Sequence, residues 1–297
     1  MRVFKYMKRQ SLGDNIFDIT ILALSFTLLI IIVYPLWFIV VASFSDPFRL
    51  YAGQVWLWPK GFTLIGYEMT FADSRIWLGY RNTTFYTIAG TLVSLLFTLP
   101  AAYALSRKDL VGRNIFMMFF VFTMFFGGGL IPTYLTVRSF GLVNTVWVLL
   151  IPFSVSIYNL IISRTFFSST IPVELLEAAK MDGCTNTRFF VQVVLPLSKA
   201  IVAVITLYCS VSQWNQFFTS LIYVRNASLV PLQMVLREIL LQSKTWEASM
   251  TVNPETYMLY EVMKFSVIII ATIPIMCFYP FIQKYFAKGV MIGSVKG

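Results

Sequence analysis

The chain has 297 residues, of which 58% are hydrophobic, 17% aromatic and only 12% charged. Soluble globular domains carry about 25% charged residues, so this composition excludes an ordinary soluble domain and is typical of a protein surrounded mainly by lipid. The net charge of +10 does not indicate nucleic-acid binding, because the basic residues form short clusters between apolar runs without an aromatic-interleaved stripe or zinc-type spacing.

Side chains that carry most enzyme chemistry are scarce. The chain contains no histidine, which is the commonest general base and metal ligand. Its three cysteines, Cys184, Cys209 and Cys277, have neither metal nor redox spacing, and no disulfide is expected. We therefore expect no catalytic residues and no metal site. A membrane enzyme, which is one alternative, would lack a catalytic constellation.

Six apolar stretches predict an all-α polytopic membrane protein with six transmembrane helices. Each stretch supplies the roughly 17–25 residues that span a bilayer. The stretches lie at about Ile19–Phe44, Thr83–Ser106, Phe116–Val137, Thr145–Ile162, Ala200–Val224 and Phe265–Ile282. The third is the weakest, because a triple glycine at 127–129 interrupts it. The gaps are too short for a separate soluble domain, so residues 1–297 are expected to form one transmembrane domain.

The distribution of charge predicts the orientation. With the N-terminus inside, most of the basic residues and fewer than half of the acidic ones fall on the inner side, as the positive-inside rule requires. Six spans then return the C-terminus to the same side. The two long segments left outside, Phe48–Tyr80 and Asn226–Tyr260, are candidates for docking an extracytoplasmic protein, or they merely cover the outer face.

The segment between the fourth and fifth stretches, at about 163–197, reads as two short helices and a turn. Pro172 fits the first helical position, and Gly183 falls where a left-handed residue would stop the helix. Thr185 can cap a second helix, which is expected to end before Pro196. Exposed apolar side chains on the first helix suit a groove in a partner; they are Leu175, Leu176, Ala178, Ala179 and Met181.

A family resemblance rests on this segment. The run Glu177-Ala178-Ala179, three residues, Gly183, nine residues, Val193, one residue, Leu195-Pro196 resembles the EAA loop of ABC importer permeases, with Val in place of the usual Ile. The run from Leu99 to Arg107 and the tail from Phe281 to Gly297 are similar to the maltose-type carbohydrate permeases, and among them to the LplC-like branch associated with complex oligosaccharides. The tail from Gly289 onward is expected to be extended.

The resemblance implies a type I importer permease fold and a role in sugar import. In the family the EAA helix docks in a cleft of the ATPase subunit and transmits its closure to the membrane helices, which alternate between inward- and outward-open states. The expected ATPase-coupling residues are Glu177, Ala178, Ala179, Asp182, Gly183, Leu195 and Pro196. Asp182 has a second reading, as a residue that only aids the turn.

The resemblance also implies the partners and the location. They are a second permease subunit, which the branch favours as a different chain, two ATPase subunits and an extracytoplasmic solute-binding protein. The chain itself is expected to bind no cofactor, because it has no Walker-type motif and ATP and Mg²⁺ belong to the ATPase subunits. It is expected in a bacterial inner membrane, with both termini cytoplasmic. A secondary transporter, the other alternative, would keep ionisable residues near the midplane, and the spans contain almost none.

Polar residues in the fifth stretch suggest a substrate path. Tyr208, Ser212, Asn215, Thr219 and Tyr223 recur every three or four residues and would share one face of a continuous helix. Such a stripe must face protein or water. Either it lines a sugar cavity or it joins helices by hydrogen bonds, and both readings stand. The candidate substrate residues are Trp214, Asn215, Gln213, Ser212 and Thr219.

Overall fold

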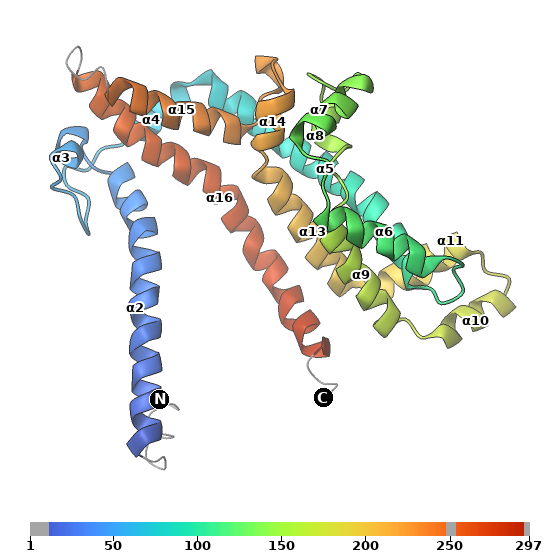
Figure 1. Ribbon diagram of the computed structural model, residues 1–297. Coiled ribbons are helices and arrows are strands. Elements are labelled where there is room, and N and C mark those ends of the chain that lie inside the picture. Colours follow the sequence, from blue (N-terminus) through green and yellow to red (C-terminus); the bar gives the residue numbers. More distant parts are fainter. Residues whose placement is uncertain (1–11, 248–253, 294–297) are drawn as a thin grey trace. The chain divides into compact units, whose positions relative to one another are not determined.

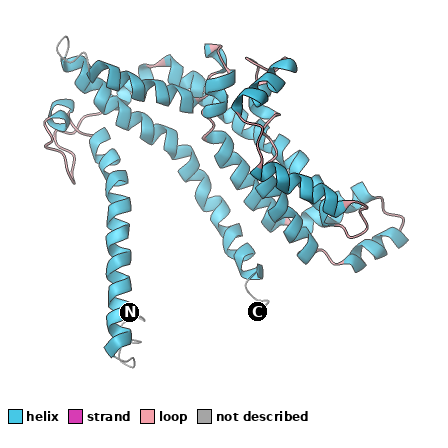
Figure 2. Ribbon diagram, in the orientation of Figure 1, coloured by secondary structure: helices cyan, strands magenta, loops and turns pink. Residues whose placement is uncertain are grey.

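The computed structural model is helical throughout the part of the chain that it describes, residues 12–247 and 254–293, with side chains placed for residues 13–241 and 257–277. No strand occurs within these ranges, which confirms the all-α prediction (Figure 2). The chain divides into two compact units. One comprises residues 1–72 and 239–270, and the other comprises residues 73–238 and 271–297.

The first unit begins with a long apolar helix, most of which is exposed. Its elements are α2 (Leu12–Ser43), α3 (Pro47–Tyr51) and α4 (Ile65–Ala72), together with parts of α15 (Leu232–Glu247) and α16 (Pro254–Gly293). The most apolar window of α2 has no buried residue. α4 packs closely on α16, because a Cβ on Gly66 would lie only 2.4 Å from the Ser266 hydroxyl and 2.8 Å from Val262. Only glycine permits that approach.

The second unit is built on α5 (Ser74–Ser106), against which α9 (Ile157–Thr170) and α13 (Lys199–Trp214) pack (Figure 1). The shorter helices of this unit are α6 (Arg113–Phe125), α7 (Leu130–Ser139), α8 (Trp147–Leu150) and α14 (Phe218–Tyr223), with the 3-10 turn η3 (Ala227–Leu229). One hydrophobic core joins α5, α9, α13 and the segment between the last two. It consists of Leu99, Ala102, Tyr103, Phe167, Phe189, Val194, Ile201, Ile205 and Cys209.

The predicted spans are only partly continuous helices. Within the described residues, three helices are long and apolar enough to cross a membrane, or five if each of two bent pairs counts as one span. The third predicted span is one of these pairs, α6 and α7, bent by 117° beside the triple glycine. The fourth is not a single helix, because α8 ends at Leu150 and α9 begins at Ile157. Pro152 in that gap cannot donate the hydrogen bond that a continuous helix needs.

The fifth predicted span is also broken. α13 ends at Trp214 and α14 begins at Phe218. The prediction of one polar stripe from Tyr208 to Tyr223 is therefore wrong, since helical spacing is not maintained across the break. The C-terminal expectation fails as well, because α16 remains helical as far as Gly293; the last residues of the tail lie outside the described part.

Candidate functional site

The segment between α9 and α13 forms a helical hairpin, with α10 (Val173–Met181) as its first arm and α11 (Asn186–Phe189) as the start of its second. Pro172 is the N-cap of α10, with extended backbone angles, rather than its first helical residue. Glu174 lies in the first turn and Lys180 in the last, and both charges complement the helix dipole. Local sequence thus defines where this arm begins and ends.

The turn of the hairpin is closed by backbone hydrogen bonds around Gly183. Its N–H donates to the carbonyl of Lys180 at 3.0 Å, and the N–H of Cys184 donates to the carbonyl of Ala179 at 2.9 Å. This pair of bonds is the Schellman motif, which requires a left-handed residue between helix and loop. Gly183 has φ of +72°, as predicted. No atom lies within 4 Å of the position where a Cβ would be, so glycine is needed for its backbone angle and not for space.

The second arm departs from the prediction. Thr185 caps α11 by accepting a hydrogen bond from the N–H of Arg188 at 3.3 Å, as expected. The arm does not end before Pro196, however, but continues through a π-helical turn, η2 (Phe190–Val194), into α12 (Leu195–Leu197). Proline lacks an N–H, and its ring clashes with an ordinary α-helical turn, so a widened turn directly before Pro196 accommodates it. Leu195 and Pro196 therefore belong to the arm itself.

The two faces of α10 differ in character. Leu176 and Ala179 pack against the core that joins α5, α9 and α13. Ala178, Asp182 and Met181 are exposed, the last of them to 89%. Glu177 is also exposed, on the side of the helix that faces the end of α5. No residue of α10 is fully buried. The helix therefore presents an apolar surface and a carboxylate to solvent, as a helix does that binds in a groove of another protein.

A group of polar residues joins the end of α5 to both arms of the hairpin. Arg107 donates to both carboxylate oxygens of Asp109, through Nε at 2.8 Å and through Nη2. Its Nη1 donates to the side-chain oxygen of Asn186, at the start of α11, at 2.7 Å. Lys180, in the last turn of α10, lies 3.4 Å from the same carboxylate of Asp109. We call these four residues the clamp.

The charges of the clamp affect one another. The hydrogen bonds from Arg107, followed by those from Lys180, hold the pKa of the Asp109 carboxyl well below its ordinary range. The hydrogen bonds to Asp109 in turn raise the pKa of Arg107. Arg107, Asp109 and Asn186 were not among the functional residues predicted from the sequence. The only available signal was that Arg107 ends the motif at the close of the second predicted span.

Aromatic rings pack together in the core next to the clamp. The ring of Tyr103, one turn before Arg107 on α5, stacks on Phe190 with centroids 5.3 Å apart. Phe167 of α9 meets it edge-on at 6.1 Å. Phe189, at the end of α11, is 1% exposed. The second arm is thus anchored in the core, whereas the first arm rests on it mainly through two residues.

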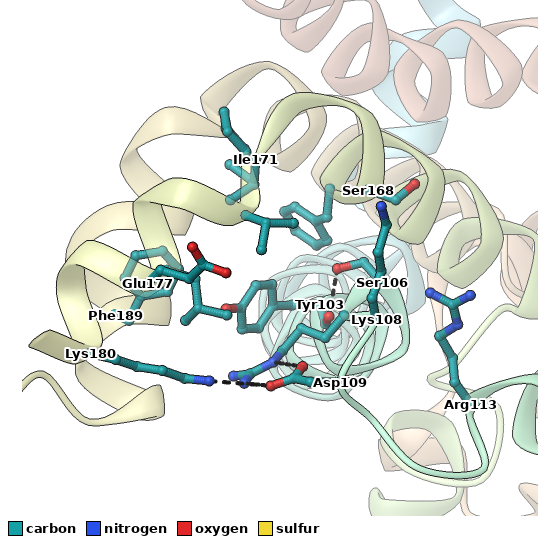
Figure 3. A pocket seen from close by; sticks show the side chains of 15 residues that line it. Tyr103, Ser106, Lys108, Asp109, Arg113, Ser168, Ile171, Glu177, Lys180 and Phe189 are labelled. Carbon is teal, nitrogen blue, oxygen red and sulfur yellow. Dashed lines mark hydrogen bonds and ion pairs between the residues drawn. The ribbon is translucent and has the colours of Figure 1, made fainter.

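A cavity of about 220 Å³ lies between the end of α5, the end of α9 and α10 (Figure 3). In the view of Figure 3, Glu177 and Lys180 lie on one side of the cavity and Arg113 on the other. Cations outnumber carboxylates in its wall; the charged lining residues are Arg107, Lys108, Asp109, Arg113, Glu177 and Lys180. The lining therefore carries a net positive charge.

The candidate substrate residues are dispersed by the break after α13. Trp214 is 5% exposed, and its indole N–H donates to the carbonyl of Ala271 at 3.1 Å. Gln213 packs against Gly90 of α5, where a Cβ would lie 2.6 Å from its side chain. Asn215 is exposed and donates to the carbonyl of Val211, while Thr219 lies on α14. Of the predicted stripe, Ser212 lies on α13, Asn215 follows its end and Thr219 lies on α14, so the three do not share one helix face.

The comparison with known proteins decides the family. A family model described as the inner membrane component of binding-protein-dependent transport systems matches residues 76–292. The chain belongs to this family. Among solved structures, a chain of a bacterial ABC transporter involved in the import of the acidic polysaccharide alginate is similar to it, with a TM-score of 0.85 and 33% identity. The match covers 93% of this chain and 99% of the other.

Two curated relatives match most of the chain. Protein LplC of Bacillus subtilis (strain 168) is 40% identical over 267 residues, which cover 90% of each chain. The polygalacturonan/rhamnogalacturonan transport system permease protein YtcP of the same organism is 38% identical over 290 residues, 96% of this chain and 99% of the relative. This chain is therefore a multi-pass permease of an ABC transport system that includes other subunits, and it is not an enzyme.

Proposed function

We propose that this permease imports an oligosaccharide and that its α10–α11 hairpin couples the closure of partner ATPase subunits to alternating access. The observation that carries the coupling role is the exposed face of α10. It presents apolar side chains and Glu177 to solvent, while the Schellman turn at Gly183 holds its end in a defined direction. A short helix that is fixed on one side and exposed on the other can be moved by the groove that receives it.

The other components of the proposed transporter are partner chains. The proposed complex contains this permease, a second permease of different sequence, two ATPase subunits and an extracytoplasmic solute-binding protein. ATP and Mg²⁺ bind to the ATPase subunits, and this chain binds no cofactor. Both termini and the hairpin face the cytoplasm in this proposal, which the excess of basic residues on that side supports.

The substrate class follows from the relatives. YtcP is named for polygalacturonan and rhamnogalacturonan transport, and the solved transporter imports alginate; all three polymers are rich in uronic acids. We propose an acidic oligosaccharide as the cargo. Its carboxylates would need cations along the path in addition to hydrogen-bond donors. α13 carries no cation after Lys199, so the second permease is expected to contribute one.

The test is uptake by the complete complex reconstituted in liposomes, with oligogalacturonate compared with a neutral oligosaccharide of the same length. Glu177→Lys reverses the exposed charge of α10 and should assemble but lose uptake. Glu174→Lys, on the same helix but away from the cavity lining, is the matched control and should retain it. Normal uptake by the Glu177→Lys complex would contradict the coupling role, and uptake of the neutral sugar alone would contradict the proposed cargo.

A further inference from the structure

The clamp lies at the turn of the hairpin, where a single small side chain, Cys184, packs against the core. α10 has no fully buried residue, and its apolar anchors, Leu176 and Ala179, lie along the helix rather than at the turn. The contacts of the clamp are made on either side of Gly183, at Lys180 and at Asn186. The polar clamp therefore adds to the limited apolar packing of Cys184 in holding the turn region to α5.

Within the clamp, Arg107 carries most of the interaction. Its side chain is only 15% exposed. Its planar guanidinium donates hydrogen bonds to Asp109 and Asn186 at the same time. A lysine side chain cannot make both sets of hydrogen bonds, because its ammonium group is a compact point charge without the planar array of donors of a guanidinium. The Lys180–Asp109 pair is longer, at 3.4 Å, and both side chains are about half exposed, so it contributes little by itself.

We propose that Arg107 and Asp109 are positioning residues for coupling. They fix the turn of the hairpin to the end of α5, so that a displacement of α10 moves α5 instead of being absorbed by the turn. This inference rests on the proposed coupling role of the hairpin. Its physical basis is that motion passes between elements only through contacts that stay made during the motion, and α5 is the helix on which α9 and α13 pack.

The test compares Arg107→Gln and Arg107→Lys with Arg113→Gln. Arg113 lines the same cavity, and its side chain forms no hydrogen bond or ion pair with the described residues of the hairpin, so it is a matched cationic control. Hydrogen exchange of the amides of the turn and of α11, which Arg107 contacts through Asn186, is measured in the purified, complete complex. Both Arg107 variants should exchange about tenfold faster than the control, as expected for the loss of a charged hydrogen bond.

The second readout is the ATPase rate with and without the solute-binding protein. Loss of the clamp predicts that the assembled Arg107→Lys complex still hydrolyses ATP but loses its stimulation. Asn186→Ala removes one partner without touching the charge and should give a smaller effect in the same direction. Exchange and stimulation equal to those of Arg113→Gln would overturn the inference. If Glu177→Lys also keeps normal uptake, the coupling role fails; if it does not, only the clamp fails.

Discussion

The indole N–H of Trp214 donates a hydrogen bond to the backbone carbonyl of Ala271, 57 residues further along the chain. The ring of Tyr80 meets the same indole edge-on, with centroids 6.0 Å apart. Trp214 thus connects the end of α13 to α16 within one compact unit. The sequence left two roles open for this residue, lining a sugar cavity or joining helices. The observed contacts favour the second role.

Replacement of Trp214 should therefore damage assembly before it changes substrate preference. Trp214→Ala leaves a cavity in the core, a change that costs about 3–5 kcal/mol in buried sites, and should lower the melting temperature and yield of the purified complex. Trp214→Phe keeps a ring but loses the hydrogen bond and should have a smaller effect. Asn215→Ala, at the next residue but exposed, is the control. A stable Trp214→Ala complex with altered sugar preference would assign the residue to the substrate path.

Substitution of Gly183 should reveal a backbone effect. Gly183→Leu places a Cβ at a positive φ, which costs about 1–2 kcal/mol, and should disturb the hairpin and reduce uptake. Gly183→Asn should be tolerated better, because asparagine visits the left-handed region more readily. Uptake and membrane abundance of both variants are measured. Equal damage from the two would indicate that a partner subunit contacts this position directly.

The predicted orientation can be read by thiol labelling. After replacement of Cys184, Cys209 and Cys277, a single cysteine is placed at Lys60, which is exposed in the segment between α3 and α4, or at Met181 on α10. An impermeant reagent should label position 60 in intact cells and position 181 only after lysis. The reverse pattern would contradict the orientation derived from charge.

The clamp should be insensitive to pH over the physiological range. Its Asp109 carboxyl has a pKa lowered from the ordinary 3.8, chiefly by hydrogen bonds from Arg107. A carboxyl with a depressed pKa stabilises the folded state fully above its ordinary value, and that contribution is lost only as the pH falls through the depressed one. The difference in ATPase stimulation between the parent and Asp109→Asn complexes should therefore be constant from about pH 5 to pH 8. A difference that shrinks towards pH 5 would show that Asp109 becomes protonated there.

Much of the hairpin could be predicted from residues close together in the chain. Gly183 and Thr185 act on backbone groups within a few positions, so their roles as turn and cap were predictable, and both are confirmed. Pro196 was misread because a proline is compatible with a helix when the preceding turn widens. The candidate substrate stripe failed for a similar reason, since spacing says nothing about whether a helix continues past Trp214.

Composition and local pattern by themselves determined that this chain is a helical membrane protein with an exposed hairpin, because hydropathy and capping depend on each residue and its immediate neighbours. Only the tertiary structure decided what holds that hairpin. Arg107 and Asn186 are separated by 79 positions, and nothing near either one indicates the other. Their contact exists because α9, α10 and α11 fold back on the end of α5, where the core around Tyr103 brings the two side chains within hydrogen-bonding distance.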